Sequence, residues 1–202
     1  MFRIAVIIAS TRQGRFADTV AHWFTSQARQ RADLGLDVID LRDVQLRQVQ
    51  QTPFECDDPA VHALAARIDA ADGIVVITPE YNHGYPASLK LAIDSVYRPW
   101  HAKPVGFVSY GGISGGLRAV EQLRLVFAEL HAVTIRDTVS FAMAHTQFDA
   151  HGYPHDADAV NGAVKTLLDQ LTWWARALRE ARFAQPYGSK PPSRQGVNAY
   201  ER

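Results

Sequence analysis

Short apolar runs alternate along the chain with longer segments whose apolar residues recur at helical spacing. The runs predict five strands, at 2–9, 36–41, 73–78, 105–109 and within 132–142. The amphipathic segments predict five helices, at 16–31, 59–71, 87–97, 117–130 and 160–178. Regular alternation of strands and helices favours one parallel sheet with helices on both faces.

Two doubly wound strand orders are common for such a sheet. The dinucleotide-binding order requires Gly-x-Gly-x-x-Gly after the first strand, and this chain has only Gly14 there, although Asp40 closes the second strand. We therefore predict the flavodoxin-like order 2-1-3-4-5. In that order, the loops that begin at Ser10 and Pro79 line one crevice at the switch point of the sheet.

The length of 202 residues suits one domain, which we place at 1–184, and the Pro, Gly and Ser-rich segment 185–202 reads as a tail that is flexible or ordered by a partner. Basic and acidic residues balance at 21 each, which favours a small-molecule partner over nucleic acid or a membrane. A single cysteine excludes an internal disulfide framework, and the histidines lack metal-ligand spacing, so we expect no metal. Without a leader peptide or a transmembrane run, we expect a cytoplasmic protein.

The loop after the first strand carries hydroxyl groups and arginines at the start of a predicted helix. It reads Ser10-Thr11-Arg12-Gln13-Gly14-Arg15. Each arginine at a helix N-terminus costs about 0.3–1 kcal/mol of stability, because its charge is repelled by the positive end of the helix dipole, and Asp18 offsets part of this cost. Free backbone N–H groups there bind anions, so a phosphate would remove the conflict.

Two further loops follow buried strands. They are Pro79-Glu80-Tyr81-Asn82 after the third strand and Ser109-Tyr110-Gly111-Gly112-Ile113-Ser114-Gly115-Gly116 after the fourth. Together with the first loop, they resemble the NAD(P)H-dependent FMN reductase family, which includes flavin, quinone, chromate and azo-dye reductases. The resemblance extends over about residues 1–180.

This resemblance implies an FMN-dependent oxidoreductase with NADPH or NADH as the reductant. In the family's arrangement, Ser10, Thr11, Arg12 and Arg15 would hold the FMN phosphate, Pro79, Glu80, Tyr81 and Asn82 would border the flavin ring, and Ser109, Gly111 and Gly112 would approach its other side. The family often has Ser or Asn near Arg15, so that contact departs from its pattern. The resemblance also implies a small-molecule electron acceptor and a homodimer or homotetramer.

The chemistry needs no side chain as a general acid or base, because the cofactor carries the electrons. We therefore expect no strictly catalytic residue, and we expect Glu80 to pack or form an ion pair in its turn rather than donate a proton.

Two alternatives belong to other classes of function. Gly112-Ile113-Ser114-Gly115-Gly116 matches the Gly-x-Ser-x-Gly elbow of serine hydrolases, with Asp137 or Asp149 and His151 or His155 downstream as triad partners. A flavodoxin-type electron carrier is the other alternative, although such carriers are usually acidic and this chain is neutral.

Overall fold

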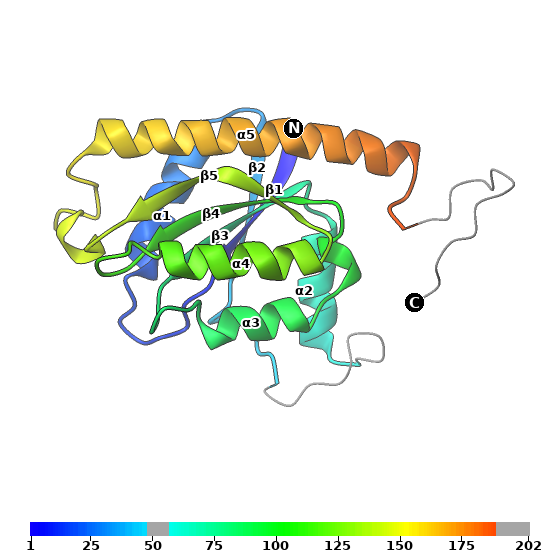
Figure 1. Cartoon of the computed structure of the whole chain (residues 1–202), viewed down its shortest axis with the longest axis horizontal. Helices are drawn as coiled ribbons and strands as arrows, with labels where there is room; N and C mark the ends of the chain where they lie inside the picture. The colour runs from blue at the N-terminus through cyan, green and yellow to red at the C-terminus, as the bar shows by residue number, and fades with distance from the viewer. Residues whose placement is uncertain (48–56, 189–202) are drawn as a thin grey trace, which may run out of the picture.

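A five-stranded parallel sheet in the order β2-β1-β3-β4-β5 forms the centre of the protein (Figure 1). The computed structural model describes residues 1–47 and 57–188. The strands are β1 (Phe2–Ile8), β2 (Leu34–Asp40), β3 (Gly73–Pro79), β4 (Pro104–Tyr110) and β5 (Val133–Phe141). The helices are α1 (Ala17–Ala28), α2 (Pro59–Asp69), α3 (Ala87–Asp94), α4 (Leu117–Glu129) and α5 (Ala157–Ala184), with 3-10 turns at Arg98–Trp100 and Ala144–Thr146. The predicted flavodoxin-like fold and strand order are confirmed.

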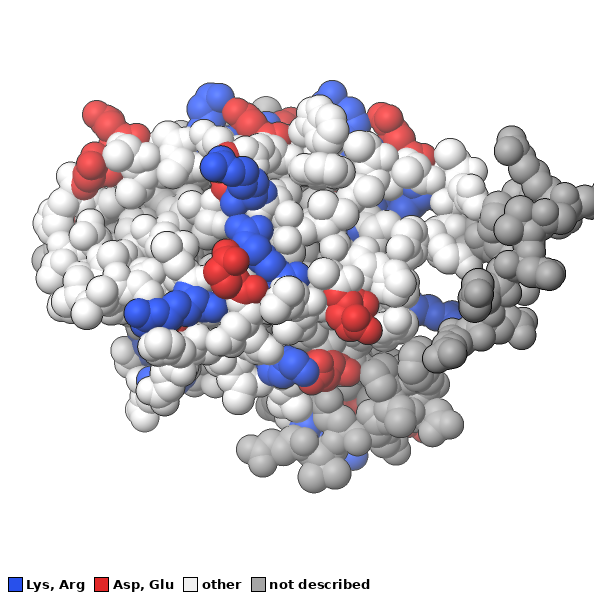
Figure 2. All heavy atoms as spheres, viewed as in Figure 1, with Lys and Arg blue, Asp and Glu red and all other residues white. Residues whose placement is uncertain are grey.

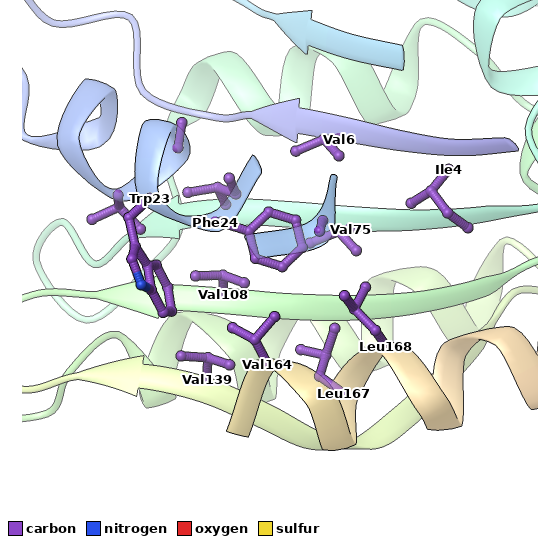
Figure 3. Packing of buried hydrophobic residues seen from close by; sticks show 14 of the residues in the cluster. Ile4, Val6, Trp23, Phe24, Val75, Val108, Val139, Val164, Leu167 and Leu168 are labelled. Carbon is purple, nitrogen blue, oxygen red and sulfur yellow. The ribbon is translucent and has the colours of Figure 1, made fainter. Parts of the chain in front are cut away.

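Helices cover both faces of the sheet because both faces are apolar. Every residue of β3 is buried, as expected for a central parallel strand. One face packs against α1 and α5, where Phe24 and Leu168 meet Val75 (Figure 3). The other face packs against α2, α3 and α4. Full burial of such a side chain contributes about 1.5–3 kcal/mol.

Two helices end three residues before the point that their apolar periodicity predicts. The first ends at Ala28 rather than near residue 31. The third ends at Asp94 rather than at residue 97, because a 3-10 turn containing Pro99 follows it. The Trp100 indole donates to the Val96 carbonyl at 2.6 Å and to the Ile93 carbonyl at 3.3 Å, and the second of these belongs to the last turn of α3, where carbonyls lack helical partners. Of the tail predicted at 185–202, residues 189–202 lie outside the described part of the chain.

The surface in Figure 2 carries basic and acidic side chains side by side rather than in one broad patch of a single sign. Over residues 1–47 and 57–188, the structure has no helix with the length and apolar character required to cross a membrane.

Candidate functional site

Three loops meet where β1, β3 and β4 end, because the strands are parallel and paired in register. Ile8 pairs with Ile77, and Pro79 pairs with Tyr110. The pairing continues past β1, where the Ala9 N–H donates to the Ile77 carbonyl at 2.9 Å. All three predicted loops therefore lie at one edge of the sheet.

The first and second loops are in contact through two side chains that were predicted independently as cofactor-binding residues. The hydroxyl groups of Ser10 and Tyr81 lie 2.8 Å apart, within hydrogen-bond distance. Ser10 is fully buried, while the Arg12 guanidinium carbon lies 3.4 Å from the centroid of the Tyr81 ring. Arg12 forms no ion pair with any described carboxylate, so its charge is available to an anion. Thr11 is exposed beside a separate hollow of about 530 Å³ that Ser88 also lines.

Arg15 lies in a different environment from Arg12, although both were predicted to hold phosphate. Its side chain is 1% exposed and forms ion pairs with Asp18 and Asp40. It also donates to the Ser10 carbonyl. Burial opposes ionisation of Asp40, but hydrogen bonds from Arg15 and from the Arg42 N–H outweigh it, and the pKa of Asp40 lies below its usual range. Arg15 thus ties the first loop to the end of β2.

A tight turn presents Tyr81 and Asn82. The N–H and carbonyl groups of Tyr81 pair with those of Gly84 at 2.8 and 3.0 Å. Asn82 and His83 both have positive φ, at 51° and 69°, which is the pattern of a type I′ turn. Asn tolerates that conformation well and His less often. Pro79 is buried at the end of β3, so the turn starts from a fixed point.

Glu80 connects the second loop to the start of α4. Its carboxylate accepts hydrogen bonds from the Ser114 hydroxyl at 2.6 Å and from the Arg118 N–H at 3.2 Å, and it pairs with the Arg118 guanidinium. Burial opposes its ionisation, yet these donors lower the pKa of Glu80 below its usual range. Glu80 is therefore an anionic cap of α4, whose own preceding residue, Gly116, offers no side chain. The sequence reading gave Arg118 no role.

The third loop depends on two glycines that the sequence analysis quoted without a role. A Cβ on Gly115 would lie 2.3 Å from the Ser140 hydroxyl, and one on Gly116 would lie 2.7 Å from the Ser109 Cβ. Both glycines also have positive φ. Their adjacent placement directly before a predicted helix was the available signal.

Ser109, Gly111 and Gly112, which were predicted to approach the flavin ring, lie in different surroundings. The Ser109 hydroxyl is buried and donates to the Gly115 carbonyl at 2.8 Å, so it braces the loop. A Cβ on Gly111 would lie 3.3 Å from the Gly116 nitrogen. A Cβ on Gly112 would meet no atom within 4 Å. Gly112 is thus the glycine that borders open space.

The hydrolase alternative requires a histidine beside Ser114, and the structure places the Glu80 carboxylate there. The Ser114 hydroxyl donates to this carboxylate. Of the downstream carboxylates, Asp149 accepts the backbone N–H groups of His151 and Tyr153, both at 2.9 Å, and Asp137 accepts from Gln170. The described contacts therefore assemble no Ser-His-Asp triad.

Comparison with known proteins identifies relatives that cover between about half and most of this chain. The sequence pattern of the family described as NADPH-dependent FMN reductase matches residues 2–146. An NAD(P)H-dependent FMN reductase of Schizosaccharomyces pombe is 36% identical over 56% of this chain and 60% of its own length. A 2-hydroxy-1,4-benzoquinone reductase of a Burkholderia species is 30% identical over 88% of this chain and 98% of its own length. The structure of FerB, a flavoenzyme NAD(P)H:(acceptor) oxidoreductase of Paracoccus denitrificans, superposes with a TM-score of 0.72 at 23% identity, covering 86% of this chain and 98% of FerB.

The fold is flavodoxin-like, and the relatives of this chain are oxidoreductases. The chain belongs to the NADPH-dependent FMN reductase family. This confirms the family and the enzyme class predicted from the sequence, and neither the hydrolase nor the electron-carrier alternative is supported.

We predict that Asp40→Asn lowers the free energy of unfolding by about 1.5–3 kcal/mol at pH 7, since it weakens charged hydrogen bonds to buried Arg15. The pKa of Asp40 is lowered in the folded state. Its stabilisation is therefore complete above the unfolded pKa of about 3.9 and is lost as pH falls through the folded value. Urea unfolding of the variant and of the unmodified protein, at pH 7 and at about pH 3, measures the difference in their free energies of unfolding. Asp43→Asn, at an exposed carboxylate 3.9 Å from Arg42, is the control; equal effects of the two variants would contradict the assignment.

Proposed function

We propose that this protein binds FMN in the crevice formed by the three loops and passes electrons from NAD(P)H to a quinone or a similar acceptor. The observation that carries the proposal is Arg12, which lies beside Ser10 and Tyr81 where the strands end and has no carboxylate partner within the described part of the chain. Bound FMN supplies the electron-transfer chemistry. The names of the relatives support both the cofactor and a quinone as acceptor.

For the phosphate, Arg12, Thr11 and the N–H groups of the first loop are the proposed direct contacts, and Ser10 adds a hydroxyl. A phosphate monoester requires such convergent donors with positive charge. The donors of Arg15 are engaged by Asp40, Asp18 and the Ser10 carbonyl. We therefore propose that Arg15 shapes the loop that holds the phosphate.

For the flavin ring, the turn from Pro79 to Asn82 is the proposed border on one side and Gly111 to Gly112 on the other. The Tyr81 ring offers a flat apolar surface once Arg12 turns toward an anion. The ion pair of Arg118 with Glu80 keeps this carboxylate charged and occupied, so protons for a reduced acceptor come from solvent rather than from Glu80.

Exposed apolar side chains lie in or beside the third loop, with Ile113 88% and Met143 42% exposed. They support the proposal of a homodimer or homotetramer, which would cover them. A cytoplasmic location stays a prediction.

The absorption spectrum of the purified protein with added FMN, before and after anaerobic NADPH and then a benzoquinone, tests this function. Flavin bands that co-elute with the protein, bleach with NADPH and return with the quinone are the expected result. Failure of the protein to retain FMN would refute the proposal.

We predict that Arg12→Ala weakens FMN binding by about 1.5–3 kcal/mol, which is the value of a charge-assisted hydrogen bond. Quenching of FMN fluorescence on titration measures the affinity. Arg29→Ala removes the same charge from the exposed far end of α1 and serves as the control. FMN affinity equal to that of the unmodified protein would exclude Arg12 from the phosphate site.

We predict that Gly112→Val abolishes FMN retention without loss of stability, because the new side chain extends into space that no protein atom occupies. Gly162→Val is the matched control, since a Cβ on Gly162 in α5 also meets no atom within 4 Å. Retained FMN is measured by absorbance and stability by thermal unfolding. A Gly112→Val protein that purifies yellow would contradict the assignment of this side of the ring.

A further inference from the structure

A second cavity, of about 660 Å³, lies at the opposite end of β4 from the crevice. Its lining includes Lys103, which directly precedes β4, and Arg182 and Tyr187, which lie at and beyond the end of α5. Since β4 advances about 3.3 Å per residue from Pro104 to Tyr110, the two sites are on the order of 20 Å apart. The cavity is therefore separate from the proposed FMN site.

The lining carries three cationic side chains and one carboxylate. The cations are Arg98, Lys103 and Arg182, and the carboxylate is Asp69, which leaves a net charge of three minus one, or +2. No carboxylate among the described residues forms an ion pair with any of the three cations. By contrast, the buried Arg15 has two carboxylate partners.

The burial of Lys103 is costly, because the nearby carboxylates of Asp69 and Asp72 offset it only in part and neither forms an ion pair with the ammonium. Lys103 is 3% exposed, and its ammonium donates to the carbonyls of Ile68 and Asp69, each at 2.6 Å, at the end of α2. Burial lowers the pKa of Lys103 to about 8, and it also lowers the pKa of Arg182. An anion in the cavity would offset the penalty of burying these charges.

Donors remain available for such an anion. Lys103 has three N–H groups and uses two of them, and Arg182 uses one nitrogen to donate to the Ala102 carbonyl. Arg98 is exposed and has no hydrogen bond from its side chain to a described residue. The Nε2 atom of His101 is buried without a hydrogen-bond partner among the described residues. The ring centroids of His101 and Tyr187 lie 5.7 Å apart, which gives the cavity an aromatic wall.

We propose that this cavity is a binding site for a small multivalent oxyanion of the phosphate or polycarboxylate class. Arg98, Lys103 and Arg182 supply the charge, and His101 supplies a further polar contact. An anion with two or more negative charges complements the net positive charge of the lining. The proposal does not depend on FMN binding at the other end of the sheet.

Isothermal titration of the full-length protein at pH 8 with pyrophosphate and, separately, with citrate tests the site and distinguishes the two ligand classes. Saturable binding of at least one anion is expected, and it should weaken about tenfold or more in Arg182→Met and Arg98→Gln, because each loses a charged donor. Arg176→Met makes the same change on the exposed face of α5, where Arg176 lies over Phe2, and should bind normally. Binding at the first loop is recognised separately, since added FMN or Arg12→Ala would remove it.

A second readout follows from Lys103. An anion beside its ammonium should raise the lowered pKa, so binding at pH 8 takes up protons, and the measured heat should depend on the ionisation enthalpy of the buffer. Lys103→Met should abolish that dependence. Absence of binding by both anions, or equal affinity in Arg182→Met and Arg176→Met, would overturn the proposal even if Lys103→Met fails to fold.

Discussion

The register of the buried parallel strands is the constraint on which the rest of this structure depends. β1, β3 and β4 are apolar on both faces of the sheet. A shift of one residue in the pairing of a strand would turn each of its side chains to the opposite face, where different helices pack. The observed pairing ends the three strands at a common edge. Every contact between the loops, from Ser10 with Tyr81 to Glu80 with the start of α4, follows from that alignment.

Charged groups then fix the loops in ways that apolar packing does not. Arg15 joins the first loop to the end of β2 through Asp40, and Glu80 joins the second loop to the third. Both arrangements use a carboxylate whose pKa is held below its usual range despite burial. In contrast, Arg12 and the cations beside Lys103 form no ion pair with a carboxylate in residues 1–47 and 57–188. The distribution of paired and unpaired cations therefore distinguishes groups that hold the fold from groups available to ligands.

The sequence predicted the layers, the strand order and the family because those follow from apolar periodicity and from loop motifs at strand ends. It also selected Ser10 and Tyr81, which are in contact although 71 positions separate them. It marked Arg15 as a departure from the family's pattern but could not show what Arg15 does instead, since only the fold brings Asp40 against it. It also missed the capping role of Glu80, because that carboxylate serves a helix that begins far along the chain at Leu117.

The capping of α4 by Glu80 has a mechanical consequence. A helix capped by the residue that directly precedes it can fray without disturbing other segments. The N-terminus of α4 is instead capped by Glu80, which belongs to the turn that carries Tyr81. Outward motion of that turn breaks the bonds to Ser114 and Arg118 together. The turn that carries Tyr81 and the start of α4 are thus joined through one carboxylate, and we expect them to open as one cooperative unit.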